Sequence, residues 1–257
     1  MKIYGDYHTH TVYSDGLGTV RQNVLAARAA GLKDIGISDH GFNNYSFSLT
    51  RKKVARQKAE IDKLRQEFED INIFYSIEAD IISLDGTVDM TLEEMEGFDY
   101  IIAGFHRWTR PKSAKDYFRL YIPIYKTFMR AAKPKEIVRH TDAVIKMLTK
   151  YPIAIYPHMN SGMYVDPVAV AEACADLDVL VELNVKHLVR NLGKVNFEKL
   201  LSTRAKFIIS SDAHRPERIG RTDRVLEFIK PYNLDGQRVV NLGDKTPDFR
   251  TYKNWRK

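Results

Sequence analysis

Histidines and carboxylates in this chain gather in and directly after short apolar runs. The first such segment, HTHTVYSDG, contains His8, His10 and Asp15. Six of the eight histidines follow this rule. The candidate metal ligands selected in this way are His8, His10, Asp39, His40, Glu78, His106, His158, Asp212 and His214. Imidazoles and carboxylates without thiolates suit Zn²⁺, Mn²⁺ or Fe²⁺, so the pattern predicts a metal site.

The spacing of His8 and His10 has a physical reason. Residues i and i+2 of a β-strand point to the same side, so both imidazoles can face one ion. The nine candidate ligands exceed what a single tetrahedral ion binds. We therefore expect two or three divalent ions.

Apolar runs of strand length alternate with helical patterns along the chain, which predicts β-α units and a parallel sheet. The expected strands are 3–8, 34–38, 71–81, 99–105, 152–157, 179–185 and 206–211. Seven such units predict an α/β fold, a closed or nearly closed barrel forming one domain over residues 1–257. All strands of such a barrel end at one face, where active sites are built. The candidate ligands should meet there.

The expected helices are 19–30, 50–69, 91–97, 166–176, 196–203 and 217–229. The excursion 107–150 contains two further helical patterns, separated at Lys133–Pro134, and its length suits a lid or a specificity element. We expect His140, within the second pattern, to be structural or exposed. The tail 250–257 is expected to fray at its end.

Composition narrows the function classes. A single cysteine, Cys174, excludes a disulfide framework and cysteine-rich zinc modules, and its helical setting predicts an inert thiol. No apolar stretch approaches the length of a membrane span and no secretion signal is evident, so we expect no membrane partner and a cytoplasmic location. The formal charge of +7 favours phosphate-bearing partners without deciding among them. Nothing in the sequence fixes the oligomeric state.

The ordered motifs resemble one known family across nearly the whole chain. HTHTVYSDG, ISDH, the strand residue Glu78, GFHR, YPH and SSDAHRPERIG are similar to the polymerase and histidinol phosphatase (PHP) superfamily. This resemblance implies a distorted seven-stranded, TIM-like (β/α)₇ barrel with a trinuclear metal cluster. It also implies hydrolysis of phosphoester bonds.

The resemblance distributes the ligands over three ions: His8, His10, Glu78 and Asp212 for one, Glu78, His106 and His158 for a second, and Asp15, His40 and His214 for the third. Some relatives carry histidine at the position of Asp15, so the aspartate alters the third ion's affinity or identity. Asp39 is expected to orient a ligand imidazole from behind. Gly16 is expected to permit the turn that brings Asp15 back to the barrel mouth.

The implied reaction uses a hydroxide shared between the ions as the nucleophile. Glu78, Asp212 and His214 are the expected catalytic residues, although the general acid is open between His214 and a metal-bound water. Expected substrate contacts are Arg107, Arg215 and His187, with Arg110, Lys186 and Arg190 as weaker candidates.

We expect a small phosphorylated substrate and phosphomonoester hydrolysis similar to that of histidinol-phosphate phosphatases. A nuclease acting on DNA or RNA ends is the alternative, which the net positive charge favours slightly. A non-catalytic metal-binding domain would be expected to have lost ligands, and a binuclear amidohydrolase usually adds a carboxylated lysine. We therefore rank both of these functions below the phosphatase and the nuclease.

Overall fold

A ring of parallel strands positions the site. The computed structural model describes residues 2–127, 129–188 and 192–255. The strands are β1 (Gly5–Thr9), β2 (Asp34–Ile37), β3 (Asn72–Asp80), β4 (Tyr100–Gly104), β5 (Ile153–Tyr156), β6 (Leu180–Asn184) and β7 (Phe207–Ser210). They pair in sequence order, each parallel to the next. Thr9 also bridges Ala213, just beyond β7, so the barrel is nearly closed. The expected α/β barrel of seven strands is confirmed.

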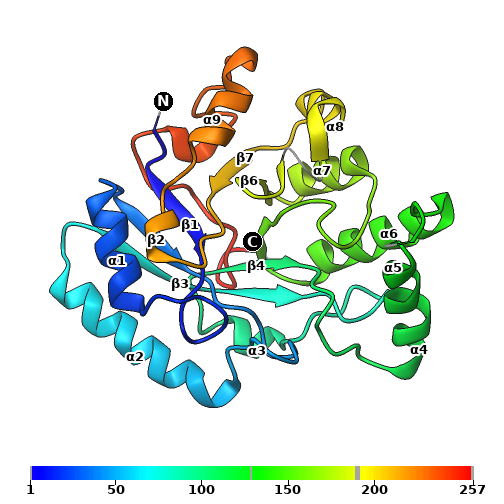
Figure 1. The fold of residues 1–257 in the computed structure, drawn as a ribbon, viewed down its shortest axis with the longest axis horizontal. Helices are drawn as coiled ribbons and strands as arrows, with labels where there is room; N and C mark the ends of the chain where they lie inside the picture. Colours follow the sequence, from blue (N-terminus) through cyan, green and yellow to red (C-terminus); the bar gives the residue numbers. More distant parts are fainter. Residues whose placement is uncertain (1, 128, 189–191, 256–257) are drawn as a thin grey trace.

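Helices surround the strands, as Figure 1 shows. Their bounds are α1 (Val20–Ala29), α2 (Arg51–Glu67), α3 (Leu92–Met95), α4 (Ala114–Asp116), α5 (Ile122–Lys126), α6 (Pro134–Lys150), α7 (Pro167–Asp176), α8 (Gly193–Leu201) and α9 (Asp223–Ile229). Local sequence fixes several of their starts. Thr91 and Glu94 form the expected capping box of α3, and Asp166 caps α7 ahead of a proline.

The last helix differs from its expected span of 217–229. Residues Pro216–Arg218 form a separate 3₁₀ turn and α9 begins only at Asp223. Gly220 lies between them at φ +70°, a left-handed conformation that interrupts a helix and that glycine adopts without steric cost. Helix α8 is also displaced from its expected span, since it begins at Gly193 rather than at 196.

The excursion 107–150 contains two structural parts. The first holds α4, a π-helical turn at Tyr117–Tyr121, and α5. The second is α6, which packs against α7 and therefore belongs to the ring of helices around the barrel. His140 is buried in α6, where its Nδ1 lies 3.0 Å from the carbonyl oxygen of Tyr164, as a structural histidine should. The lid function of the first part stays a prediction.

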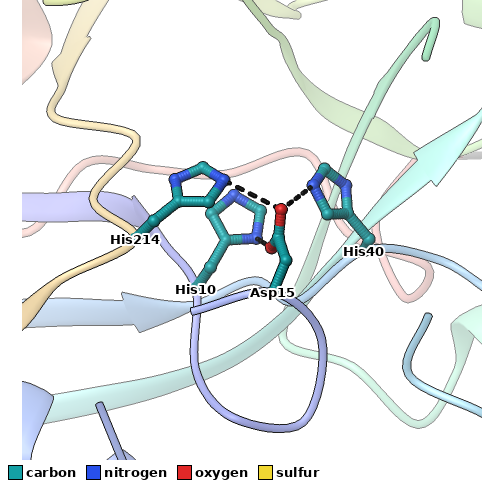
Figure 2. A group of neighbouring side chains, drawn as sticks. All are labelled: His10, Asp15, His40 and His214. Carbon is teal, nitrogen blue, oxygen red and sulfur yellow. Dashed lines mark ion pairs between the residues drawn. The ribbon is translucent and has the colours of Figure 1, made fainter. Parts of the chain in front are cut away.

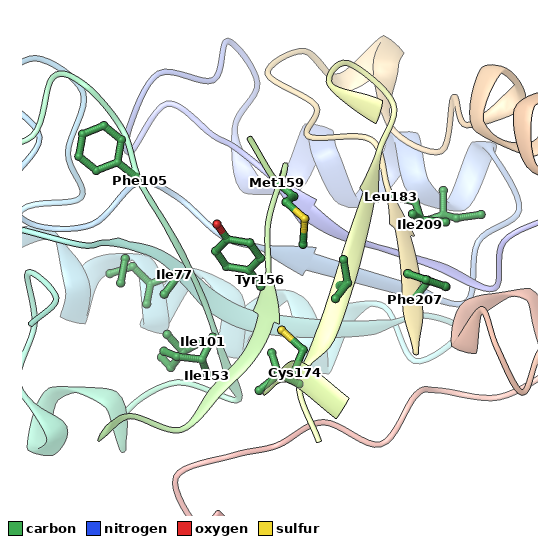
Figure 3. Close-up of a cluster of buried hydrophobic side chains, with 14 of the residues drawn as sticks. Ile77, Ile101, Phe105, Ile153, Tyr156, Met159, Cys174, Leu183, Phe207 and Ile209 are labelled. Carbon is green, nitrogen blue, oxygen red and sulfur yellow. The ribbon is translucent and has the colours of Figure 1, made fainter. Parts of the chain in front are cut away.

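Two apolar clusters hold the barrel together. The larger lies between the strands and the helices; Figure 3 shows part of it, including the buried thiol of Cys174. The smaller includes Tyr7, Tyr100, Ile102 and Ile208. Ile102 pairs in register with Glu78, and Ile208 pairs with Glu182. Paired residues of neighbouring strands point the same way, so the smaller cluster lies in the lumen. Tyr100 pairs with Ser76, two residues before Glu78, so the cluster extends from the level of Glu78 toward the lower end, where the strands begin.

The C-terminal segment closes the lower end of this lumen. The ring of Phe249 stacks on Tyr100 with centroids 4.4 Å apart and meets the ring of Tyr7 at 5.2 Å. The guanidinium group of buried Arg250 donates a hydrogen bond to the carbonyl oxygen of Leu148. The expected fraying of 250–257 therefore does not begin at its first residue, and residues 256–257 lie outside the described part of the chain.

Among the described residues, no helix combines the length and the apolar character that crossing a bilayer requires.

Candidate metal centre

Glu78 stands at the centre of the polar upper lumen. Its Oε2 atom lies 3.2 Å from His8 Nε2, 3.6 Å from His10 Nε2 and 3.1 Å from His40 Nδ1. Its Oε1 atom lies 2.8 Å from His158 Nε2 and 3.6 Å from His106 Nε2. One carboxylate thus faces five imidazoles, three on one oxygen and two on the other.

Asp15 gathers a second group of imidazoles at the mouth of the barrel (Figure 2). Its Oδ2 atom lies 3.2 Å from His214 Nε2 and 3.4 Å from His40 Nε2, and its Oδ1 atom lies 3.7 Å from His10 Nδ1. His10 and His40 therefore connect the Asp15 group to the Glu78 group. Asp212 adds a further carboxylate, with Oδ1 at 3.2 Å from His10 Nε2.

The donor atoms fit divalent cations. Two donors that each lie about 2.1 Å from one tetrahedral ion are separated by about 3.4 Å. The separations around Glu78 and Asp15 scatter about this value. Several of the fully buried donor atoms have no hydrogen-bond partner among the described residues: His8 Nε2, His10 Nδ1 and Nε2, His40 Nδ1, and Glu78 Oε2. Buried polar atoms of this kind require a partner, and a cation supplies one.

Electrostatics within the cluster favour the ionised carboxylates. Burial opposes ionisation of Glu78, but the surrounding imidazoles of His8, His106 and His40 hold the pKa of Glu78 well below its usual range. Burial and the neighbouring His40 lower the pKa of His10 to about 3, so its neutral, ligating form prevails. Burial opposes protonation of His8 and His40, but the charge of Glu78 raises the pKa of both, so metal binding at these two rings must displace protons.

Two site residues have an unusual backbone. His158 has φ of +28° and Asp212 has φ of +53°. Positive φ is uncommon outside glycine, although it is several-fold enriched at aspartate and histidine. Such strain persists only where the surrounding structure enforces it, and it gathers at functional sites. Here it redirects the chain immediately after β5 and β7.

Gly16 also serves the turn, but not through its φ. A Cβ atom at this position would lie 2.4 Å from the carbonyl carbon and oxygen of His10. The HTHTVYSDG segment can fold back on itself only because residue 16 has no side chain. This close approach brings Asp15 beside His10.

Asp39 does not have the role expected of it. Its carboxylate accepts hydrogen bonds from the Thr11 backbone and hydroxyl, from Ser14 Oγ and from Gln57 Nε2. Among the described residues its carboxylate makes no hydrogen bond or ion pair with an imidazole. Asp39 therefore braces the turn that carries Asp15, and the prediction that it orients a ligand imidazole is wrong.

Two other carboxylates support the ligands from behind. Glu182 Oε1 lies 2.7 Å from His8 Nδ1, and its Oε2 accepts a hydrogen bond from the backbone N–H of His158. Asp80 Oδ1 lies 2.9 Å from His106 Nδ1 and also accepts from the His106 backbone N–H. Both carboxylates are buried. Such partners fix the ring orientation and tautomer of a ligating histidine.

The expected substrate residues lie on different sides of the mouth. A hollow of about 450 Å³ above the histidines is lined by Arg107 and His187 together with exposed aromatic side chains. Arg215 instead lines an adjoining hollow beyond β7. Lys186 borders both hollows. Arg110 lies over the ring of Tyr45, at 5.4 Å, and Arg190 falls outside the described residues.

Comparison with known proteins defines the class. The PHP domain family matches residues 6–182, more than half of the chain. The chain therefore belongs to the PHP domain family, which confirms the resemblance. The family and the donor set make it a metal-dependent phosphoester hydrolase, the enzyme class expected from the sequence.

Particular relatives cover most of the chain. A probable phosphatase of Acetivibrio thermocellus is 26% identical over 94% of this chain and 92% of its own length. The DNA polymerase/3′-5′ exonuclease PolX of Bacillus subtilis is 25% identical over 84% of this chain but only 35% of its own. A histidinol phosphate phosphatase of Lactococcus lactis, crystallised with zinc, L-histidinol and phosphate, shares the fold: its TM-score is 0.59 at 19% identity, covering 90% of this chain and 94% of that one.

Proposed function

We propose that this protein hydrolyses phosphomonoesters at a centre of two or three divalent ions, held by the nine ligand residues that the family resemblance implies. The observation that carries the proposal is the position of Glu78, whose two carboxylate oxygens each face a separate set of imidazoles. A carboxylate in this position can bridge two ions. The relatives described as probable phosphatases match this chain over nearly their whole length, which supports a phosphatase as the complete activity.

The ligand sets overlap in space. Glu78 would hold one ion with His8 and His10, and would share a second with His106 and His158. Asp15 would hold the third with His40 and His214, and His10 lies close enough to join this group. The ions, when bound, neutralise phosphate oxygens and bring water to a nucleophilic state near neutral pH. The donor types accept Zn²⁺, Mn²⁺ or Fe²⁺.

The protein's own groups position the substrate and the ligands. Glu182 and Asp80 hold the rings of His8 and His106 in fixed orientations. His214 points its ring nitrogens at Asp15 and at the carbonyl oxygen of Asp212, so as a ligand it has no proton to give, and the leaving group would take its proton from water at the mouth of the barrel. Arg107 and Arg215 would clamp the substrate from opposite sides of the mouth.

A nuclease is the second candidate. The match to PolX favours it, and so do the exposed aromatic side chains beside the centre, where Trp108 is 65% exposed and Phe47 is 47% exposed. Bases of a single strand stack on such rings. The match spans about a third of PolX, so the polymerase's activity does not extend to this chain by likeness alone.

A substrate panel separates the two functions. The metal-loaded protein is assayed with histidinol phosphate, nucleoside monophosphates and single-stranded oligonucleotides. Release of inorganic phosphate from a monoester supports the proposal, and turnover restricted to the oligonucleotides overturns it. The Glu78→Gln variant, assayed in parallel, shows whether any turnover belongs to this centre rather than to a contaminant.

A further inference from the structure

We propose that a cluster of arginines beside the metal centre is a second anion-binding subsite, so the preferred substrates carry another phosphate or carboxylate besides the phosphoryl group that is hydrolysed. This inference rests on the proposed function and names its substrate class. The subsite is the hollow of about 830 Å³ beyond β6 and β7. Its basic side chains are Lys186, Arg215, Arg218, Arg221 and Arg224.

The hollow is continuous with the metal centre. Asp212, His214 and Lys186 line both this hollow and the one above the histidines. A molecule whose phosphoryl group lies at the centre therefore has the arginine-lined hollow as a neighbouring space. A short bis-anionic molecule can occupy both places at once.

The arginines of this hollow have no acidic partner among the described residues. Arg215, Arg218, Arg221 and Arg224 are exposed, and none of the four makes an ion pair or side-chain hydrogen bond with a described residue. Elsewhere the chain pairs its arginines with carboxylates, for example in Arg21–Glu67, Arg28–Asp70, Arg51–Glu94, Arg65–Asp99, Arg130–Glu136 and Arg204–Glu172.

Acidic side chains do not cancel this charge. Glu217 and Asp223 also line the hollow, yet neither lies within ion-pair distance of a basic group among the described residues. Asp212 faces His10 and His8 rather than the arginines. The basic side chains of the hollow therefore outnumber its acidic ones and are available to an anion from solution.

A buried carboxylate ties the arginine segment to the barrel. Asp6 accepts hydrogen bonds from the backbone N–H groups of Ser211 and Gly220, so it joins β1, the end of β7 and the turn before α9. Ile219, within the same segment, is buried. The guanidinium groups therefore project from a fixed backbone, which lowers the entropy lost when an anion binds.

The chemistry selects the ligand. Guanidinium groups make charge-assisted, often bidentate hydrogen bonds with phosphate and carboxylate. An ammonium group would meet several like charges in this hollow, so histidinol phosphate, which carries one, is a poor fit here. A small bis-anionic phosphomonoester has the complementary charge pattern.

Binding of phosphonates tests the subsite without relying on catalysis, because their P–C bonds are not hydrolysed. The full-length, metal-loaded protein is titrated by calorimetry with α,ω-alkane bisphosphonates of increasing length and with alkylphosphonates of matched length. At the best length we expect a bisphosphonate to bind at least about tenfold more tightly, since one good charge-assisted hydrogen bond gives this factor. ω-Carboxyalkylphosphonates show whether a carboxylate serves as well as a phosphonate.

The variant Arg218→Ala/Arg221→Ala/Arg224→Ala should lose this gain, and the single variant Arg221→Glu should reduce it if the triple variant folds poorly. Arg204→Ala is the matched control, because it removes an exposed arginine before β7, at the far end of the strand, and should keep the gain. Equal affinity for the two phosphonates, or a gain that survives in the triple variant, overturns the subsite. Arginine-dependent binding of single-stranded oligonucleotides without a bisphosphonate gain also overturns it, in favour of a nucleic-acid surface.

The two proposals fail separately. Hydrolysis of simple monoesters without a bisphosphonate gain leaves the proposed function standing and removes the subsite. An arginine-dependent gain without hydrolysis of any phosphomonoester retains the anion site and removes the proposed phosphatase.

Discussion

The upper and lower halves of the barrel lumen are lined by different kinds of side chain. The lower half packs Tyr7, Tyr100 and Ile102 into an apolar cluster closed by Phe249. The upper half holds imidazoles and carboxylates and opens at the mouth, where Asp15, His106 and His214 are partly exposed, while several of its buried atoms lack hydrogen-bond partners among the described residues. The lower half contributes to folding without a ligand, whereas the upper half needs one. The same strands thus carry apolar residues that stabilise the fold toward one end and candidate metal ligands toward the other.

The largest expected effect comes from removing the charge at the centre of the upper half. Glu78→Gln should lower hydrolysis at least about a thousandfold and reduce bound metal, because it removes the carboxylate that would bridge two of the proposed ions. The fold should remain, since the lower cluster is untouched. Activity assays, metal analysis and circular dichroism check this, with exposed Glu69→Gln as the control. Full activity in the variant would end the assignment of this centre.

A second variant tests the carboxylate behind His8. Glu182→Gln should weaken metal binding by about ten- to a hundredfold, because the oriented ring of His8 loses its charged partner. Metal titration against a chelator of known affinity measures the change. The control is Glu172→Gln, a change at a surface ion pair with Arg204 that should leave metal affinity alone. Unchanged affinity in Glu182→Gln would place the residue outside the metal site.

A change in the lower half should have the opposite signature. Phe249→Ala should lower the free energy of unfolding by about 2 kcal/mol, because a half-buried ring is lost from the cluster. Metal content per folded molecule should not change. Urea unfolding and metal analysis test both parts, with the exposed Phe118→Ala as the control. Loss of metal from the folded variant would show that the two halves are coupled.

The smallest expected effect concerns Asp89, whose carboxylate accepts from the backbone N–H groups of Asp80 and Asn43. Burial, together with the nearby charge of Asp80, raises the pKa of Asp89 from 3.8 to about 7. Between these values the unfolded chain releases a proton that the folded chain keeps, so Asp89 lowers stability as pH rises. Relative to Asp89→Asn, the wild type should lose stability progressively across this window. Parallel melting temperatures of the two proteins from pH 4 to pH 7.5 would contradict this.

Sequence patterns predicted the barrel and its polar end because both depend on local periodicity. Strand ends and β-α alternation are visible in runs of apolar residues, and the histidines mark those ends. Asp80 was missed although it follows Glu78 by two residues, the same spacing that singled out His8 and His10. Glu182 had a similar signal, a charge inside the apolar run VLVELNV. Its partner His8 is 174 residues away, and no local pattern reports such a contact.

The segment before α9 shows a different limit. Helical periodicity in 217–229 concealed a turn at Gly220, whose N–H group donates to Asp6 at the other end of the chain. This hydrogen bond to the distant Asp6 carboxylate stabilises the turn at Gly220. The local pattern of residues 217–229 does not report it and therefore predicted a helix that begins too early. The same turn presents the arginines beside the metal centre.

The contact between Tyr7 and Phe249 has a consequence for how the protein is made. A chain leaves the ribosome from its first residue onward, so β1 is synthesised long before its aromatic partner exists. Until residue 249 emerges, the floor of the barrel presents apolar rings to water. A nascent chain in this state exposes apolar surface of the kind that chaperones bind, and the floor of the barrel can close only after residue 249 has emerged.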